Sequence, residues 1–169
     1  MAEQNRTGSD AEQNADAVTK VAELIKGQRI CMITTNSADG LVSRPMTCLD
    51  TEFDGTLWYL GLADSPLANE LAANPSVNVA FTERSSWVSL RGNGSATHDP
   101  ERANQLWSDF AKDYFQCEPD DPKVAVIRVD AEGAEYWDSP GPVGMLLDIA
   151  KARVTGKRPN LGVSGSADL

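Results

Sequence analysis

Histidine is almost missing from this sequence, and cysteine is rare. His98 is the only histidine among 169 residues, and the three cysteines, Cys31, Cys48 and Cys117, form no Cys-x-x-Cys pair. Without such ligand clusters, neither a metal site nor a disulfide framework is expected. His98 would have to be the base of any Ser-His-Asp triad, and we interpret it as a surface residue. Cys31 and Cys48 lie in apolar runs and are expected in the core.

Basic residues are also scarce. The 15 Lys and Arg residues stand against 25 Asp and Glu residues, which gives a net charge of -10. Nucleic-acid-binding domains need a basic face, so neither nucleic acid nor an anionic membrane is expected as a partner. No apolar run reaches the roughly 18 residues of a membrane span. The polar N-terminal segment contains no apolar signal region, so a cytoplasmic location is expected.

The composition that is present suits one domain. Hydrophobic residues make up 41% of the chain, which is enough for a core. We expect a disordered tail over residues 1–12, one domain over 13–154 and a flexible tail over 155–169. Acidic residues such as Asp120 and Asp121 are scattered in the manner of a solvated face. No catalytic residue can be assigned from these patterns.

Hydrophobic periodicity predicts a mainly β domain with a few helices. Helices are expected over residues 16–26, 66–73, 100–114 and 143–154. Strands are expected over residues 29–35, 41–50, 56–61, 76–82, 87–97 and 123–130, with 134–138 extending the last one or beginning another. Short turns join the first three strands, which predicts that they are antiparallel neighbours. About six strands with few helices favour an α+β fold built on a closed or half-closed barrel.

Two kinds of residue mark irregular points in these strands. Pro45 cannot donate to a ladder, so it indicates a sheet edge or a bulge. Gly92 and Gly94 indicate a bend or a close backbone approach. Their segment matches neither the dinucleotide-binding fingerprint nor the phosphate-binding loop pattern.

Several segments, taken in order, resemble the pyridoxamine 5'-phosphate oxidase-like flavin-binding superfamily, and within it the general stress protein 26 group. They are GQRICMITT at 27–35, LVSRPM at 41–46, LWYL at 57–60 with DS at 64–65, NPSVNV at 74–79, WVSLRG at 87–92, LW at 106–107 with Lys112 and Phe115, DP at 121–122, and AEYWD at 134–138. The resemblance covers residues 18–154. It implies a six-stranded antiparallel Greek-key split β-barrel that forms a homodimer, with FMN in a cleft at the interface.

The resemblance also implies which residues hold the cofactor. The SRPM segment would lie along the flavin ring and ribityl chain, and Ser65 would mark the phosphate site. Aromatic residues from three regions would pack near the cofactor or across the dimer interface. The full implied set is Arg44, Pro45, Met46, Thr47, Leu60, Gly61, Ser65, Leu67, Trp87, Trp107, Lys112 and Trp137. The alternatives are that Arg44 is a surface residue, Met46 and Trp107 are core residues, and Lys112 is a solvated helix residue.

The phosphate site departs from the family pattern. The family places one or two basic residues after the serine, whereas this chain has Pro66 and Leu67. A helix N-terminus and a serine hydroxyl would remain, which is a weaker anion site than one with charged donors. Either an arginine (Arg44, Arg84 or Arg91) substitutes and keeps FMN bound, or flavin affinity is low or the pocket holds another ligand. We favour FMN binding that is retained but weakened. FAD and no cofactor are the alternatives to FMN.

Three functions fit this pattern. The first is an FMN-dependent oxidoreductase, linked to stress, with an unknown small-molecule redox partner. The second is a non-enzymatic flavin carrier or sensor. The third is a dimeric scaffold that has lost its cofactor. Oxidation of pyridoxamine phosphate itself is not expected, because the phosphate of that substrate would need a further cationic cluster.

Overall fold

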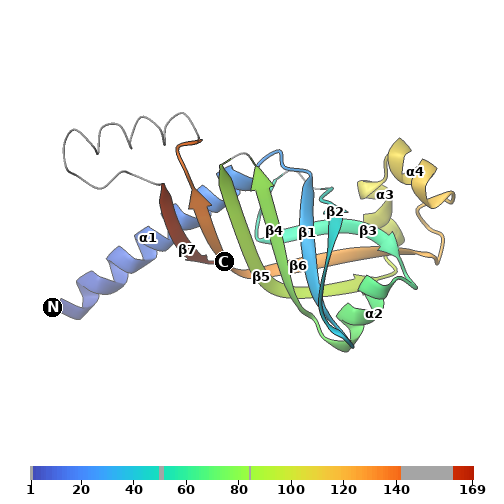
Figure 1. Ribbon diagram of the computed structural model, residues 1–169, viewed down its shortest axis with the longest axis horizontal. Helices are drawn as coiled ribbons and strands as arrows, with labels where there is room; N and C mark the ends of the chain where they lie inside the picture. Colours follow the sequence, from blue (N-terminus) through green and yellow to red (C-terminus); the bar gives the residue numbers. More distant parts are fainter. Residues whose placement is uncertain (1, 50–51, 84, 142–161) are drawn as a thin grey trace.

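The computed structural model describes residues 2–49, 52–83, 85–141 and 162–169. Its centre is one antiparallel sheet in the order β2-β1-β4-β5-β6-β3, with β7 added on the free side of β6 (Figure 1). The strands are β1 Ile30–Ser37, β2 Gly40–Thr47, β3 Thr56–Leu62, β4 Ser76–Glu83, β5 Ser86–Thr97, β6 Val124–Asp138 and β7 Val163–Asp168. The predicted α+β class with a mainly antiparallel sheet is confirmed, and residues 134–138 continue the sixth strand.

The sheet stays open between β2 and β3. These strands stand at opposite ends of the pairing order, and β3 pairs with β6. The prediction that the first three strands are all neighbours was therefore wrong for this pair. One backbone bond, from Leu49 N to Trp58 O at 3.0 Å, joins the two segments. Further along β2, Pro45 has no N–H that could donate to β3. The register between β1 and β2 is uninterrupted at the Met32–Pro45 pair, so Pro45 marks an edge strand and not a bulge.

A bulge does occur at Gly92. The register between β5 and β6 shifts between Arg91 and Gly92. A Cβ atom on Gly92 would lie 2.0 Å from the carbonyl oxygen of Asp130, so only glycine fits this approach. The predicted bend or close contact at this position is confirmed.

Helix α2 (Pro66–Ala73) closes one end of the barrel, where Leu67 and Leu71 are buried. Ser65 caps it, because its hydroxyl accepts from the backbone N–H of Ala68 at 3.2 Å. Proline at the first helical position needs no hydrogen-bond partner for its nitrogen and has a suitable fixed φ. Sequence signals therefore placed both ends of this helix correctly.

The third predicted helix is in fact two short helices, α3 (Pro100–Leu106) and α4 (Asp109–Phe115). Trp107 adopts an extended conformation, and Ser108 then caps a new helix by accepting from the N–H of Ala111. Serine competes with helix continuation in this way because its side chain replaces the backbone acceptor. The break changes the direction in which Phe110 and Tyr114 face.

Both chain ends differ from the expected tails. Helix α1 spans Ala2–Ile25, where residues 1–12 were expected to be disordered. Glutamine, glutamate and alanine in this stretch favour a helix. Strand β7 lies where a flexible tail was expected, and Ala167 is buried beneath α1 and β6. The predicted helix over residues 143–154 lies outside the described residues, and so do residues 155–161.

The core fills the inside of the barrel and its contact with α1. Val21, Ile33, Tyr59 and Phe81 are among its fully buried side chains. Cys31 and Cys48 are buried as predicted, and the Cys31 thiol lies 3.4 Å from the Tyr59 hydroxyl. Burial raises the pKa of Cys31 to about 12, so this thiol stays protonated and unreactive at neutral pH. Among the described helices, none is long and apolar enough to cross a membrane.

Candidate functional site

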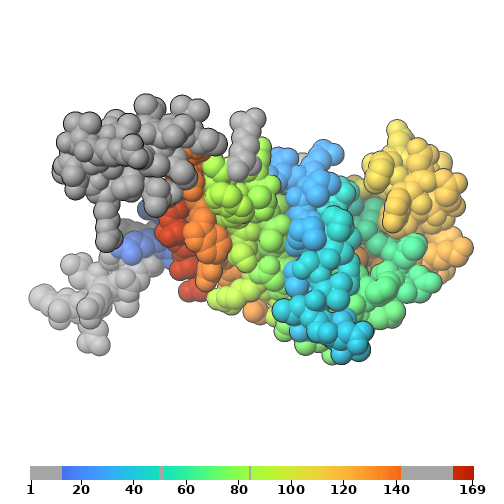
Figure 2. Space-filling view, viewed as in Figure 1, coloured from blue at the N-terminus to red at the C-terminus, as the bar shows by residue number. Residues whose placement is uncertain are grey.

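A groove follows the opening between β2 and β3. It consists of two adjoining cavities of about 220 and 190 Å³, whose linings share Met46, Leu60 and Tyr114. One end lies against α4 and the other against α2. Figure 2 shows α3 and α4 (yellow) beside β2 (cyan), with the surface hollowed between them.

The α4 end is apolar and aromatic. Its lining is Pro45, Met46, Thr47, Leu49, Leu60, Ser108, Phe110, Ala111, Tyr114 and Phe115. None of these described residues carries a formal charge. Phe110 and Tyr114 are 71% and 67% exposed, and their rings stack at 6.2 Å with an angle of 19°. Large aromatic side chains left this open to water are suited to contact with another apolar surface.

The strand edges supply polar backbone groups between the two ends. In an antiparallel pair, alternate residues direct their N–H and C=O groups away from the partner strand. The bond from Cys48 N to Arg29 O sets this alternation in β2, and the bond from Ala63 N to Lys123 O sets it in β3. The backbone groups of Thr47 and Leu60 therefore point into the gap. They offer donors and acceptors suited to a flat heteroaromatic ring.

The α2 end contains an ion pair. Arg44 Nη1 lies 2.8 Å from Glu70 Oε2, and their side chains are 21% and 14% exposed. The hydroxyl of Thr35, which is fully buried, donates to the same carboxylate oxygen at 2.5 Å and accepts from Arg44 at 3.0 Å. These bonds, from Arg44 first and then Thr35, lower the pKa of Glu70. Glu70 is therefore ionised at neutral pH.

The same end contains neutral groups suited to an anion. Ser65, Pro66 and Leu67 line it together with Arg44, Gly61, Leu62 and Ile127. The Ser65 hydroxyl uses its oxygen to cap α2, which leaves its proton available for donation. The N–H of Leu67, in the first turn of α2, has no partner within the helix. One guanidinium, one hydroxyl and one N–H can therefore meet a phosphate here.

Eight of the implied cofactor residues meet in this groove. Arg44, Met46, Leu60, Gly61, Ser65 and Leu67 line the α2 end, and Pro45 and Thr47 join at the α4 end. Leu67 is 3% exposed and also belongs to the core. The family resemblance implied that these residues lie in one groove, whereas no local sequence pattern predicted it.

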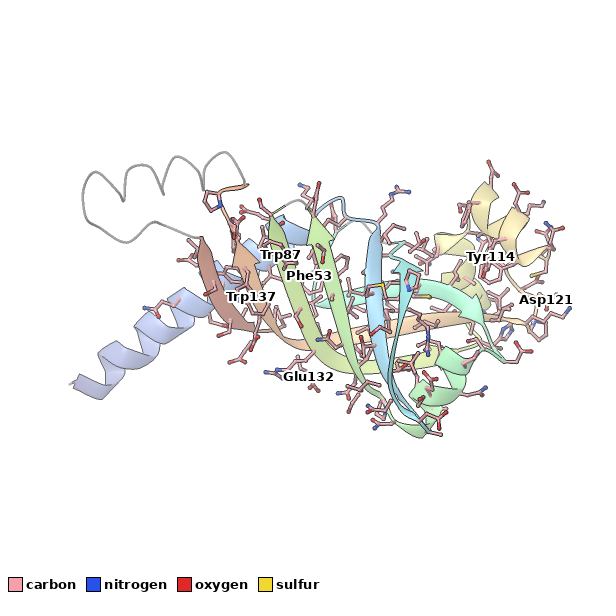
Figure 3. The ribbon with its side chains drawn as sticks, in the orientation of Figure 1. Phe53, Trp87, Tyr114, Asp121, Glu132 and Trp137 are labelled. Carbon is pink, nitrogen blue, oxygen red and sulfur yellow. The ribbon has the colours of Figure 1, made fainter. Side chains whose placement is uncertain are left out.

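The other four lie elsewhere on this chain. Trp107 packs against Val124 and Val126 and stacks on Phe115 at 5.7 Å. Lys112 is exposed and pairs with Glu118 at 3.4 Å. Trp87 and Trp137 face each other across β5 and β6 at the end of the molecule opposite to Tyr114 (Figure 3). A contact of these residues with a cofactor held by a second copy stays a prediction.

Of the alternative cations, Arg91 does not line the groove. Arg91 lies on β5 and approaches Asp168 of β7 at 3.5 Å, and Arg84 lies outside the described residues. Arg44 is thus the cation of the described groove lining. His98 is exposed, as predicted. Among the described residues, no cluster of His, Cys, Asp or Glu is suited to hold a metal ion.

The aromatic wall on α4 was not predicted from the sequence. A single helix over residues 100–114, as predicted, would place Phe110 and Tyr114 on one apolar stripe with Ala103 and Leu106 and would bury them. Their spacing of four residues does place them on one helical face. However, the cap at Ser108 starts a separate helix, and that face borders the groove. A serine followed by Asp109 was the available signal.

Comparisons with known proteins agree with this architecture. Protein bli-3 from Neurospora crassa is 27% identical over 154 residues, which cover 83% of this chain and 74% of that protein. A structure described as general stress protein 26 from Jannaschia sp. CCS1 superposes with a TM-score of 0.74 at 23% identity, over 92% of this chain and 99% of that one. The general stress FMN/FAD binding protein from Xanthomonas citri superposes with a TM-score of 0.62 at 26% identity, over 70% of this chain and 86% of that one.

A family model covers most of the chain. The model described as pyridoxamine 5'-phosphate oxidase like matches residues 16–160. That range includes strands β1 to β6 and both ends of the groove. The chain therefore belongs to the pyridoxamine 5'-phosphate oxidase-like family.

Proposed function

We propose that this chain is an FMN-binding protein whose ligand lies in the groove between β2 and β3. The observation that carries the proposal is the meeting of eight implied cofactor residues along one groove. The 26%-identical protein from Xanthomonas citri, which is described as binding FMN or FAD, supports it. FAD remains the alternative flavin.

The residues of the groove fit a flavin. The uncharged α4 end suits the apolar body of a tricyclic ring, and Phe110 and Tyr114 can stack on it. The open edges at Thr47 and Leu60 can pair with the polar edge of the ring. Ser65, Leu67 and Arg44 can meet a phosphate at the α2 end. When bound, FMN supplies electron or hydride transfer, and the chain supplies position and exclusion of water.

We propose further that the protein is a homodimer and that a second copy covers the groove. Cross-strand neighbours form one row over the outer face, from Glu135 through Ser89, Ala80 and Met32 to Pro45. On the same face, Trp87, Trp137, Ile30 and Met32 are each at least 40% exposed. This exposed apolar face reaches the groove at Pro45, so a two-fold partner seated on it also covers the groove.

Whether the bound flavin turns over is a separate question. The described groove lining has no histidine, cysteine, aspartate or lysine, so few groups are available to transfer protons. This favours either an oxidoreductase that uses hydride chemistry on an unknown partner or a flavin carrier. Anaerobic photoreduction followed by addition of candidate acceptors separates the two, because a carrier would not reoxidise with any of them. The cytoplasmic location stays a prediction.

The test of the binding proposal is a titration of the purified protein with FMN, followed by visible absorption and flavin fluorescence. We expect a saturable spectral change with one flavin per chain, and a dimer by light scattering. Ala80→Glu places a charge on the exposed apolar face, two strands away from Pro45 and outside the described groove lining. It should give a monomer with weakened FMN binding. A wild-type protein that is a folded monomer, or shows no spectral change, would end the proposal.

A further inference from the structure

We propose that Glu70 sets the phosphate selectivity of the groove, so that the site binds flavins mainly by the ring and accepts riboflavin almost as well as FMN. The inference rests on the proposed flavin site. Glu70 lies behind the groove wall and would determine specificity through Arg44. The expected ligands then include flavins without a phosphate.

Arg44 is already neutralised within the chain. Its Nη1 lies 2.8 Å from Glu70 Oε2 and 3.0 Å from Thr35 Oγ1, while the Thr35 hydroxyl donates to Glu70. The three side chains come from β2, α2 and β1, so the packing of three elements fixes their arrangement. The pair has no net charge.

The charges of Arg44 and Glu70 lie in a poorly hydrated environment. Thr35 is fully buried and Glu70 is 14% exposed, so water screens these charges less than it would on an open surface. A phosphate monoester carries nearly two negative charges at neutral pH. It would gain attraction from the guanidinium and repulsion from the nearby carboxylate. Because the pKa of Glu70 is lowered, protonation does not relieve this repulsion near pH 7.

The remaining groups available to a phosphate are neutral. Pro66 and Leu67 stand at the start of α2, and the donors left there are the Ser65 hydroxyl and the Leu67 N–H. Neutral hydrogen bonds are about half as strong as charge-assisted ones. The ring end, in contrast, is the same for FMN and riboflavin. The two ligands should therefore differ little in affinity.

The experiment measures the dissociation constants of FMN and riboflavin for the full-length protein by flavin fluorescence at pH 7. We expect the wild-type constants to agree within about tenfold. Glu70→Gln keeps the shape and a hydrogen-bond acceptor but removes the charge. It should tighten FMN binding by about tenfold while the riboflavin constant changes less than about twofold.

Asp130→Asn is the matched control. Asp130 forms an arginine pair of similar length, 2.7 Å to Arg128 Nη2, outside the described lining of the groove. The variant changes the net charge of the protein by the same amount as Glu70→Gln. It should leave both flavin constants unchanged, which separates a local effect of Glu70 from the global charge of -10.

The possible results separate this inference from the proposed function. If neither flavin binds to the wild-type protein, the proposed function fails and the inference with it. If FMN binds more than about 100-fold tighter than riboflavin, the site is flavin-specific but the inference is wrong, whether or not Glu70→Gln folds. If Glu70→Gln shifts both constants equally, Glu70 has only a structural role and the inference is also overturned.

Discussion

At its α4 end the groove is lined by aromatic and uncharged side chains, and Phe110 and Tyr114 lie open to water. At its α2 end Arg44 is held by Glu70 at 2.8 Å and by Thr35 at 3.0 Å. The aromatic side chains of the α4 end are left exposed to water when no ligand is bound, whereas the charges of the α2 end are paired within the chain. Affinity should therefore come mainly from the ring, and the phosphate should contribute little.

The largest effect is expected from removing the aromatic wall. The double variant Phe110→Ala, Tyr114→Ala should weaken FMN and riboflavin binding by a similar factor of about 30 to 140, because each ring contact contributes about 1–1.5 kcal/mol. Equilibrium titration with each flavin measures this. Both side chains are mostly exposed, so the thermal unfolding midpoint should change little.

The contrast between the two ends of the groove is tested by whether FMN and riboflavin lose affinity equally. A variant that lost FMN binding but retained riboflavin binding would place the phosphate, rather than the ring, against α4. A variant with unchanged constants for both flavins would remove α4 from the binding site altogether.

The contrast between the two ends also explains what the sequence could predict. Ser65 and Pro66 mark the start of α2 by cap chemistry that acts over four residues, so the position of the phosphate end could be predicted. The neutralisation of Arg44 could not. Glu70 lies 26 positions further along the chain, and only the packing of α2 against β1 and β2 joins them.

The barrel itself was predictable for a related reason. Alternating apolar residues specify strands locally, and most of the strand ranges agree within a few residues. The pairing of β3 with β6 could not be predicted from short turns, because it depends on tertiary closure of the sheet. Likewise, β7 contributes six residues with little hydrophobic signal, and its pairing with β6 gives it order.

A smaller effect is expected from adding a cation at the α2 end. Leu67 occupies one position where the family has a basic residue, but it is buried in the core, so a lysine there would disturb packing. Pro66 is exposed in the first turn of α2. Pro66→Lys should tighten FMN binding about fivefold through a charge near the phosphate, corresponding to about 1 kcal/mol. The riboflavin constant should stay the same.

The matched control for this variant is Pro66→Ala, which removes the proline without adding a charge. Titration of both variants with FMN at low and high salt measures the electrostatic part, since added salt screens an exposed lysine. Equal FMN constants for the two variants would show that the phosphate does not reach the start of α2.

The smallest effect concerns acid stability at the α2 end. The pKa of Glu70 is lowered in the folded state from its ordinary value of 4.5, by Arg44 first and then by Thr35. A carboxyl group with a depressed folded pKa stabilises the protein above its unfolded pKa, and this contribution is lost as pH falls through the folded pKa. We expect the advantage of the wild type over Glu70→Gln to be about 1 kcal/mol or less and constant from pH 7 to pH 5. It should shrink as pH falls below 4.5. Urea unfolding of both proteins at several pH values measures the difference, and a gap that stayed constant down to pH 3 would mean that the Arg44–Glu70 pair does not form in solution.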